Sequence, residues 1–224
     1  MIKKVCLVFL ALVVVLLAAA GVAWKLNGER WQQEYAAFRK TGAPVLMYHA
    51  VGLEEGADWP KTLIMKPELF ESHLQYLKEQ GYTIVTVAEL AERLQQGKSV
   101  DKYVALSFDD GYKNNHSVVL PLLQKYDAKG SFFVINRDIG DELHMNEQEI
   151  KELIAAGMEL GSHTYSHNPL AAIDEKYLVW ETDTSRYWLK KKFDGYIVRT
   201  LAYPNGSYND RLLMQRKNMV FTGR

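Results

Sequence analysis

Two adjacent carboxylates, Asp109 and Asp110, stand directly after an apolar run at residues 103–106. The run is typical of a buried strand, and Gly111 allows the chain to turn sharply behind the acidic pair. In α/β folds, ligands bind at the carboxyl ends of strands, where loops vary while the sheet holds their ends in place. An acidic turn is the alternative interpretation, since Asp and Gly are ordinary turn residues. A second polar cluster further along the chain favours the interpretation that the acidic pair belongs to a ligand-binding site.

That second cluster contains His163 and His167, again just after a strand-like segment at residues 158–162. Two imidazoles and one carboxylate make a set of three ligands that suits Zn²⁺ and also Co²⁺, Fe²⁺ or Ni²⁺. Three protein ligands leave room for a water whose pKa can fall to about 7, and the second carboxylate could accept its proton. The alternative is that both are loop histidines bonded to backbone groups. The spacing and the acidic pair together favour a metal site.

A third candidate element is the strand-like segment and Pro/Gly turn at residues 202–208. A backbone N–H of such a turn, most simply that of Asn205, could point at a developing oxyanion. From the residues alone an ordinary turn is an equally good interpretation.

Strand-like and helix-like segments alternate along the chain at the spacing of βαβ units. The predicted strands cover residues 44–49, 82–86, 103–108, 131–135, 158–162, 197–203 and 219–222. The predicted helices cover residues 67–81, 86–97, 118–126, 146–157, 174–193 and 209–217. The pattern predicts a parallel α/β sheet or barrel, and both polar clusters fall at strand C-termini.

Composition narrows the class of protein. With 224 residues and 48% hydrophobic composition, the chain can bury one sizeable core, which we assign to residues 44–224. The 27 Lys and Arg residues balance the 27 Asp and Glu residues, so the chain carries no net attraction for nucleic acid. Cys6 is the only cysteine, which excludes an intramolecular disulfide and a cysteine-based zinc site.

The N-terminus predicts a membrane or export segment. Residues 5–24 are uniformly apolar after Lys3 and Lys4, and twenty helical residues span roughly 30 Å, the thickness of a bilayer core. We expect residues 1–25 to be a signal anchor or signal peptide, the anchor being favoured by length, and residues 26–43 a juxtamembrane spacer. The expected location is the cell membrane, with a single span and an extracytoplasmic domain. Secretion after cleavage near Ala20 is the alternative.

Together, residues 107–111, 163–167 and 203–206 resemble the three motifs of the polysaccharide deacetylase family, the NodB-like carbohydrate esterases of family 4. The resemblance extends over residues 44–224 and implies a distorted (β/α) barrel that lacks its last C-terminal strand or strands. It implies Asp109 as general base and a divalent metal, most simply zinc, on three ligands. It also implies oxyanion and substrate contacts from the third motif. The metal ligands are Asp110, His163 and His167, and the third-motif residues are Tyr203 and Asn205.

The implied reaction is hydrolysis of an N-acetyl group, less often an O-acetyl group, on a cell-envelope or extracellular polysaccharide. The sequence gives no indication of a protein partner. Ala202 stands where the family often has an arginine, and a C-terminal Leu-x-His is absent; Arg199 is not assigned the arginine's role. Residues 44–49 resemble the start of the poly-N-acetylglucosamine deacetylase branch, which implies that His49 is the general acid. A core-edge histidine is the alternative.

The other histidines and the tryptophans receive no catalytic role. We interpret His73, His116 and His144 as structural or solvated. Trp59, Trp180 and Trp188 could stack on sugar rings, although the last two are expected to pack a helix against the barrel. The alternative functions are a non-catalytic carbohydrate-binding or envelope-assembly module and an incomplete, inactive copy of the deacetylase.

Overall fold

The computed structural model describes residues 25, 27–30, 43–52, 63–210 and 212. The expected anchor at residues 5–24, Trp59 and the expected strand at 219–222 lie outside these residues. Within them, no helix is both long and apolar enough to cross a membrane.

The core of the fold is a five-stranded parallel sheet, which confirms the predicted α/β class. The strands run in the order β1-β5-β6-β7, with β4 also paired to β5, and β2 and β3 form a separate parallel pair. Their bounds are β1 Val45–Tyr48, β2 Ala50–Val51, β3 Ile64–Met65, β4 Thr83–Val85, β5 Tyr103–Phe108, β6 Ser131–Val134 and β7 Glu159–Ser162. Among the described residues, the path of paired strands stays open between β1 and β7.

The register of the central strand, β5, shows which strands lie along each of its edges. Ala105 pairs with residues of both β1 and β4, whereas Phe108 pairs with residues of both β1 and β6. Because two partners of one residue must lie on opposite sides of it, β4 and β6 follow one another along the same edge of β5. The C-terminal end of β5 therefore lies between β1 and β6, and Asp109 follows it.

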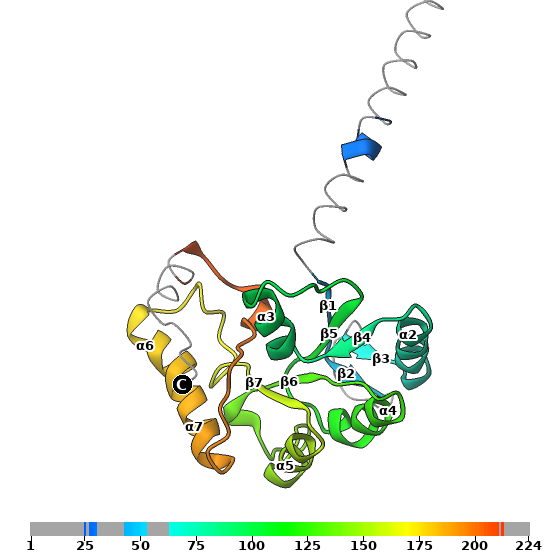
Figure 1. Cartoon of the computed structure of the whole chain (residues 1–224). Helices are drawn as coiled ribbons and strands as arrows, with labels where there is room; N and C mark the ends of the chain where they lie inside the picture. Colours follow the sequence, from blue (N-terminus) through cyan, green and yellow to red (C-terminus); the bar gives the residue numbers. More distant parts are fainter. Residues whose placement is uncertain (1–24, 26, 31–42, 53–62, 211, 213–224) are drawn as a thin grey trace, which may run out of the picture.

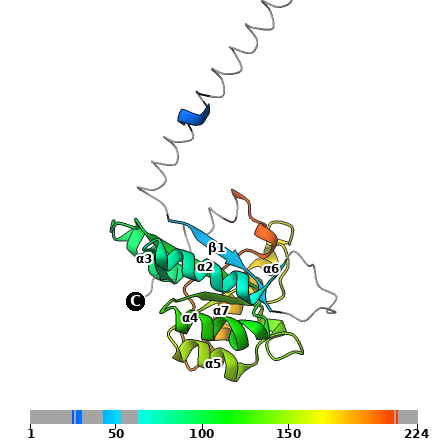
Figure 2. The same ribbon diagram turned by 90° about the vertical axis from the view of Figure 1, so that its right-hand side faces the viewer.

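Helices cover the outside of this sheet (Figure 1). They are α2 Pro67–Glu79, α3 Val87–Gln95, α4 Leu120–Lys125, α5 Glu147–Ala155, α6 Glu175–Val179 and α7 Ser185–Lys192. Figure 2 shows α2, α4 and α5 following one another along one side of the molecule. Helices α3 and α5 begin with capping boxes, at Thr86 with Glu89 and at Asn146 with Glu149, in which each cap side chain accepts a backbone N–H of the first turn.

The main hydrophobic core lies between the sheet and this arc of helices. Val104, Leu106 and Phe108 of β5 are fully buried in it, since alternate residues of a strand face the same side. The ring of Phe108 stacks on Tyr48 at 5.5 Å and on Phe132 at 4.9 Å between centroids. Tyr48 and Phe108 directly precede His49 and Asp109, so this aromatic stack fixes the ends of both strands.

The predicted strand at residues 197–203 is wrong. The segment makes one isolated parallel bridge to β7, at Leu201 opposite Ser162, and the Ala202 N–H donates to the Ser162 carbonyl at 3.0 Å. The Arg186 guanidinium donates two hydrogen bonds, at 3.1 and 2.8 Å, to the carbonyl of Val198. The segment is therefore held on both sides but forms no regular strand.

The predicted helix at residues 174–193 is interrupted. Between α6 and α7 lies a π-helical turn, η4 (Trp180–Thr184), and a second π-helical turn, η2 (Asn115–Val119), precedes α4. Trp188 packs against the main core, as expected. Trp180 does not, because 49% of its surface is exposed. Such π-turns are rare and are often found at functional sites.

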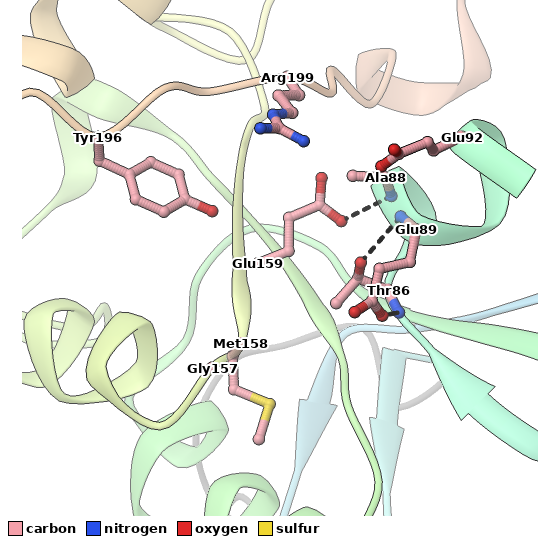
Figure 3. Close-up of a pocket in the computed structure, with 9 residues that line it drawn as sticks. All are labelled: Thr86, Ala88, Glu89, Glu92, Gly157, Met158, Glu159, Tyr196 and Arg199. Atoms are coloured by element: carbon pink, nitrogen blue, oxygen red, sulfur yellow. Dashed lines mark hydrogen bonds between the residues drawn. The ribbon is translucent and has the colours of Figure 1, made fainter.

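A buried carboxylate lies at the start of β7. Glu159, 6% exposed, accepts hydrogen bonds from the Ala88 N–H at 3.0 Å and from the hydroxyls of Ser131 and Thr200, both at 2.6 Å. Glu159 and Arg199 both line a cavity of about 210 Å³ (Figure 3). The three bonds tie the start of α3, β6 and the segment before Leu201 to β7.

Candidate active site

The acidic pair lies in a tight turn at the end of β5. The Asp109 N–H continues the sheet by donating to the Tyr48 carbonyl at 2.9 Å. Asp110 then adopts a left-handed conformation with φ of 72°, and Gly111 follows with φ of 86°. A Cβ at Gly111 would lie 3.0 Å from a Val134 methyl. Glycine is therefore required there for both conformation and space, and it lets two successive carboxylates point in different directions.

The three predicted metal ligands lie together. Oδ1 of Asp110 is 3.4 Å from Nε2 of His163 and 3.4 Å from Nε2 of His167. One ligand atom from each residue falls within 4.8 Å of the others. His163 is almost fully buried, whereas 29% of the His167 side chain is exposed. The cluster is thus open to solvent on the His167 side.

Hydrogen bonds orient these ligands for a cation. Nδ1 of His163 donates to the Ala202 carbonyl at 3.1 Å, because a carbonyl can only accept, and this leaves the Nε2 lone pair facing Asp110. The Tyr112 hydroxyl donates to Oδ2 of Asp110 at 2.7 Å. Oδ1 of Asp110 is buried and has no hydrogen-bond partner among the described residues. A buried acceptor without a donor beside two imidazole nitrogens fits a divalent cation with an N₂O ligand set.

The pKa values of the ligands keep the set ready for a cation. Burial raises the pKa of Asp110, but its contacts with His163, Tyr112 and His167 outweigh burial and lower the pKa to about 2. Burial, helped by the neighbouring His163, lowers the pKa of His167. The carboxylate is therefore ionised and His167 tends to be neutral, which are the forms that bind metal.

Asp109 has a different environment. Burial raises the pKa of its carboxyl, and the nearby His163 and His49 offset only part of that rise. One of its oxygens, Oδ1, is buried without a hydrogen-bond partner in the described part of the chain. A buried carboxylate with a raised pKa and a free oxygen has the properties of a general base.

His49 lies beside Asp109. Tyr48 and Phe108 are register partners in β1 and β5, so the residues that follow them, His49 and Asp109, end neighbouring strands on the same side. The Asn115 amide, buried within η2, donates to the His49 carbonyl at 2.9 Å and fixes its backbone. The structure therefore places the expected acid next to the expected base.

The loop that carries the two histidines is held by a buried acid, Glu181 of η4. Its carboxylate accepts the N–H of Tyr165 at 3.1 Å and the N–H of Ser166 at 2.9 Å, and it also accepts the Ser166 hydroxyl. Glu181 is 4% exposed. These three bonds fix the backbone between His163 and His167, and with it the spacing of the two imidazoles.

The third predicted element reaches the same end of the sheet. The bond from His163 to Ala202 brings the 3₁₀ turn η5 (Pro204–Gly206) close behind β7. Asn205 is exposed and left-handed, with φ of 55°, while Tyr203 packs against a small cluster of buried leucines. The roles of Asn205 in oxyanion binding and of Tyr203 in substrate binding stay predictions.

Left-handed residues other than glycine concentrate in these loops. Four of the seven in the described chain are Asp110, Thr164, His167 and Asn205. Such conformations cost energy and occur most often where function requires them.

Three supporting residues were not predicted. Tyr112 directly follows the first motif, and Asn115 falls within a segment that gives no regular pattern. Glu181 did leave a signal, because it shares the buried stripe of its helix with Leu178 and Leu189, where an acidic residue is unexpected.

The remaining histidines are structural, as predicted. His73 bonds to the Tyr48 hydroxyl and His116 to Glu152. His144 bonds to Asp141 and stacks on the Tyr112 ring at 5.1 Å, so it packs behind the metal ligands.

Comparison with known proteins agrees with this geometry. The sequence profile of the family described as polysaccharide deacetylase matches residues 96–223, more than half of the chain. This chain belongs to the polysaccharide deacetylase family. The match covers the acidic pair, both histidines and the turn at residues 204–206.

Among curated relatives, a Bacillus subtilis (strain 168) protein named as a polysaccharide deacetylase, YxkH, is 33% identical over 76% of this chain and 59% of its own length. A poly-β-1,6-N-acetyl-D-glucosamine N-deacetylase of Staphylococcus aureus (strain MSSA476) is 28% identical over 67% of this chain and 56% of its own. The chain thus spans less than three fifths of each of these relatives.

Solved deacetylase structures share the fold. The Streptococcus pyogenes deacetylase PplD, solved with acetate, has a TM-score of 0.72 at 30% identity and covers 80% of both chains. IcaB from Ammonifex degensii has a TM-score of 0.68 at 25% identity and covers 80% of this chain and 81% of its own. The α/β deacetylase fold predicted from the motifs is therefore confirmed.

Proposed function

We propose that this protein is a metal-dependent hydrolase that removes N-acetyl groups from a cell-envelope or extracellular polysaccharide. Family membership supports the reaction class. The observation that carries the proposal is the pair of carboxylates at the end of β5, each with a buried oxygen to which no described residue donates. One of them faces two imidazoles, and the other lies beside His49.

Each residue then has a distinct part in the reaction. A divalent ion on Asp110, His163 and His167, most simply zinc, would supply a Lewis acid for the acetyl carbonyl and lower the pKa of a water. Asp109 accepts the proton of the water that attacks the acetyl carbon. His49 donates a proton to the amine nitrogen as the C–N bond breaks, so that acetate and a free amine leave. The backbone N–H of Asn205, with Tyr203 beside it, is proposed to face the oxyanion.

Acetate release from defined glycans tests the proposal. We expect the full chain to release acetate from oligomers of β-1,6-linked N-acetylglucosamine, chitin oligomers or peptidoglycan. Activity should disappear with a chelator and return with Zn²⁺, Co²⁺ or Ni²⁺. Because the Staphylococcus aureus relative is named for poly-β-1,6-N-acetyl-D-glucosamine, the β-1,6-linked oligomer is the first substrate to test. Activity that persists after metal removal would contradict the mechanism.

Ala202 motivates a second candidate, a carbohydrate-binding module without turnover. Its carbonyl accepts from His163, so this position contributes backbone but no cationic side chain to the site. Binding of the same oligomers by the zinc-loaded chain, without acetate release, would favour this candidate.

We also propose that residues 5–24 attach the protein to the cell membrane, with the catalytic domain on the extracytoplasmic side. The support is the uninterrupted apolar run in the sequence. Membrane fractionation of the full chain, compared with a variant that begins at residue 26, tests this. If the uncleaved full chain and the shortened variant were recovered equally in the soluble fraction, the proposed attachment to the membrane would be contradicted.

A further inference from the structure

A pair of aromatic rings lies next to the loop of the two histidines. The rings of Tyr165 and Trp180 are 5.1 Å apart between centroids and inclined by 59°. Tyr165 is half-buried, and 49% of the Trp180 surface is exposed. We call these two residues the aromatic platform. Trp180 is a large apolar side chain that packs on Tyr165 and not in the main core.

One residue of the platform, Tyr165, belongs to the loop that carries the two candidate histidine ligands. Tyr165 lies two residues from each histidine ligand, so its Cα is at most about 7 Å from theirs. Trp180 directly precedes Glu181, whose carboxylate fixes the backbone N–H of Tyr165. The same π-helical turn therefore sets both the histidine loop and the position of the outer ring. The platform is held in a fixed place relative to the metal ligands.

The charge around the platform indicates what kind of partner it fits. Apart from the buried Glu181, residues 174–184 contain three acidic side chains and one lysine. An anionic membrane surface attracts basic segments, so this face is a poor match for one. A neutral sugar chain carries no charge to repel, and the apolar faces of its rings match the flat faces of Trp and Tyr. Proximity to the metal ligands also favours the polymer that reaches them.

We propose that the aromatic platform is a binding subsite for the polysaccharide, which stacks a sugar unit next to the one that is deacetylated. This inference rests on the proposed function, because it takes the substrate to be an N-acetylhexosamine polymer. It assigns Tyr165 and Trp180 to substrate length and affinity, not to the chemical step. A substrate too short to reach Trp180 gains nothing from it.

Kinetics on oligomers of different length test the subsite. We expect Trp180→Ala to raise KM for a hexamer of β-1,6-linked N-acetylglucosamine about tenfold, as loss of one well-placed aromatic contact typically does. The values of kcat, KM for the monosaccharide and zinc affinity should not change. Trp180→Phe should restore most of the hexamer KM. Tyr187→Ala is the matched control, because Tyr187 is 61% exposed on α7 and lies farther along the same helical segment.

Direct binding separates this inference from the proposed function. Calorimetry of the metal-free full chain with the hexamer should show binding that Trp180→Ala weakens about tenfold, whether or not acetate is released. Acetate release with a hexamer KM that Trp180→Ala leaves unchanged would overturn the platform alone. Loss of binding to phosphatidylglycerol vesicles in Trp180→Ala, with hexamer affinity unchanged, would assign the platform to a membrane. Wild type that neither binds nor deacetylates any of the three glycans would overturn both proposals.

Discussion

The two ends of β7 both lie near buried carboxylates, but the hydrogen bonds of these groups differ. At the start of the strand, Glu159 accepts from one backbone N–H and two hydroxyls, and both of its oxygens have donors. Beyond the other end, Asp109 and Asp110 each keep one buried oxygen without a donor in the part of the chain that the structure describes. All three residues are less than 10% exposed. Burial alone therefore does not separate structural from functional acids.

The difference lies in what each environment is built to hold. A buried carboxylate whose two oxygens both have donors holds its neighbours in place. A buried oxygen without a donor costs free energy unless a cation, a water or a substrate supplies the missing interaction. Glu159 thus belongs to the fold, and the pair after β5 belongs to the chemistry. Substitutions at the two ends should affect different measurements.

The largest effect should come from Asp109→Asn. An amide cannot accept the proton of the attacking water, so kcat should fall by about 10²–10⁴-fold, the usual contribution of a general base. Zinc affinity should change little, because Asp110, His163 and His167 are intact. Acetate-release kinetics and chelator competition measure the two quantities. An equal loss of zinc affinity would show that Asp109 is itself a ligand.

Asp109 also sets a pH dependence. Burial raises its pKa above the usual 3.8, and only the ionised form acts as a base, so kcat/KM should fall as the pH drops through that raised pKa. The native state binds more protons than the unfolded state between the usual and the raised pKa, so stability falls as pH rises through this window. Asp109→Asn should therefore unfold at the same or a higher temperature than wild type at pH 7. A lower melting temperature would contradict this assignment.

Glu159→Ala should affect stability instead. Three donors would lose their acceptor, and we expect a loss of about 2–4 kcal/mol in the free energy of unfolding. For a protein of this size this corresponds to a decrease of roughly 4–16 °C in melting temperature. Zinc affinity and kcat per folded molecule should stay near wild type. Glu92→Ala is the control, because Glu92 lines the same cavity at an exposed position. A tenfold loss of kcat without loss of stability would show that Glu159, at the start of β7, also serves the reaction.

The features that could be predicted from the sequence are those that follow from local pattern and strand topology. The meeting of the acidic pair with His163 and His167 was predictable because parallel strands bring their carboxyl ends to one edge, and apolar runs mark those strands. The choice of Asp110 as the candidate metal ligand came from the family resemblance. The apolar run of β5 likewise predicted a buried strand, and residues 104–108 are all buried. Both features depend on local pattern and on a general rule of topology.

What failed depends on contacts between distant segments. The strand predicted at residues 197–203 is reduced to one bridge to β7, and a side chain of α7, Arg186, bonds the Val198 carbonyl. The helix predicted at 174–193 is present as the contiguous α6, η4 and α7, and only the π-turn within it, with Trp180 exposed and Glu181 buried, was not predicted. No pattern within either segment encodes its partner, so only the assembled fold reveals it.

Glu181→Ala should give the next largest effect, and it tests whether an acid with a full set of donors can still serve the site. The Ser166 N–H and hydroxyl would lose their acceptor, and the Tyr165 N–H would keep only the Glu181 main-chain carbonyl, so the two imidazoles would lose part of their fixed spacing. Zinc affinity should fall about 10–100-fold, as is common for groups that orient metal ligands. Chelator competition measures this, and Glu181→Gln should retain part of the affinity. Unchanged zinc affinity in Glu181→Ala, in a folded protein, would place Glu181 with Glu159 as a residue of the fold only.

The smallest effect should come from Tyr112→Phe. The Tyr112 hydroxyl is the donor that occupies Oδ2 of Asp110 and leaves Oδ1 for the cation. Phenylalanine keeps the ring that stacks on His144, so the substitution removes one hydrogen bond to a charged group and little packing. Such a bond contributes about 1.5–3 kcal/mol, but the vacated oxygen can turn toward the metal or bind water, so zinc affinity should fall no more than about tenfold. Calorimetric zinc titration at pH 7 measures the loss. Tighter zinc binding in Tyr112→Phe would mean that Oδ2 competes for the cation and that the tyrosine restrains Asp110.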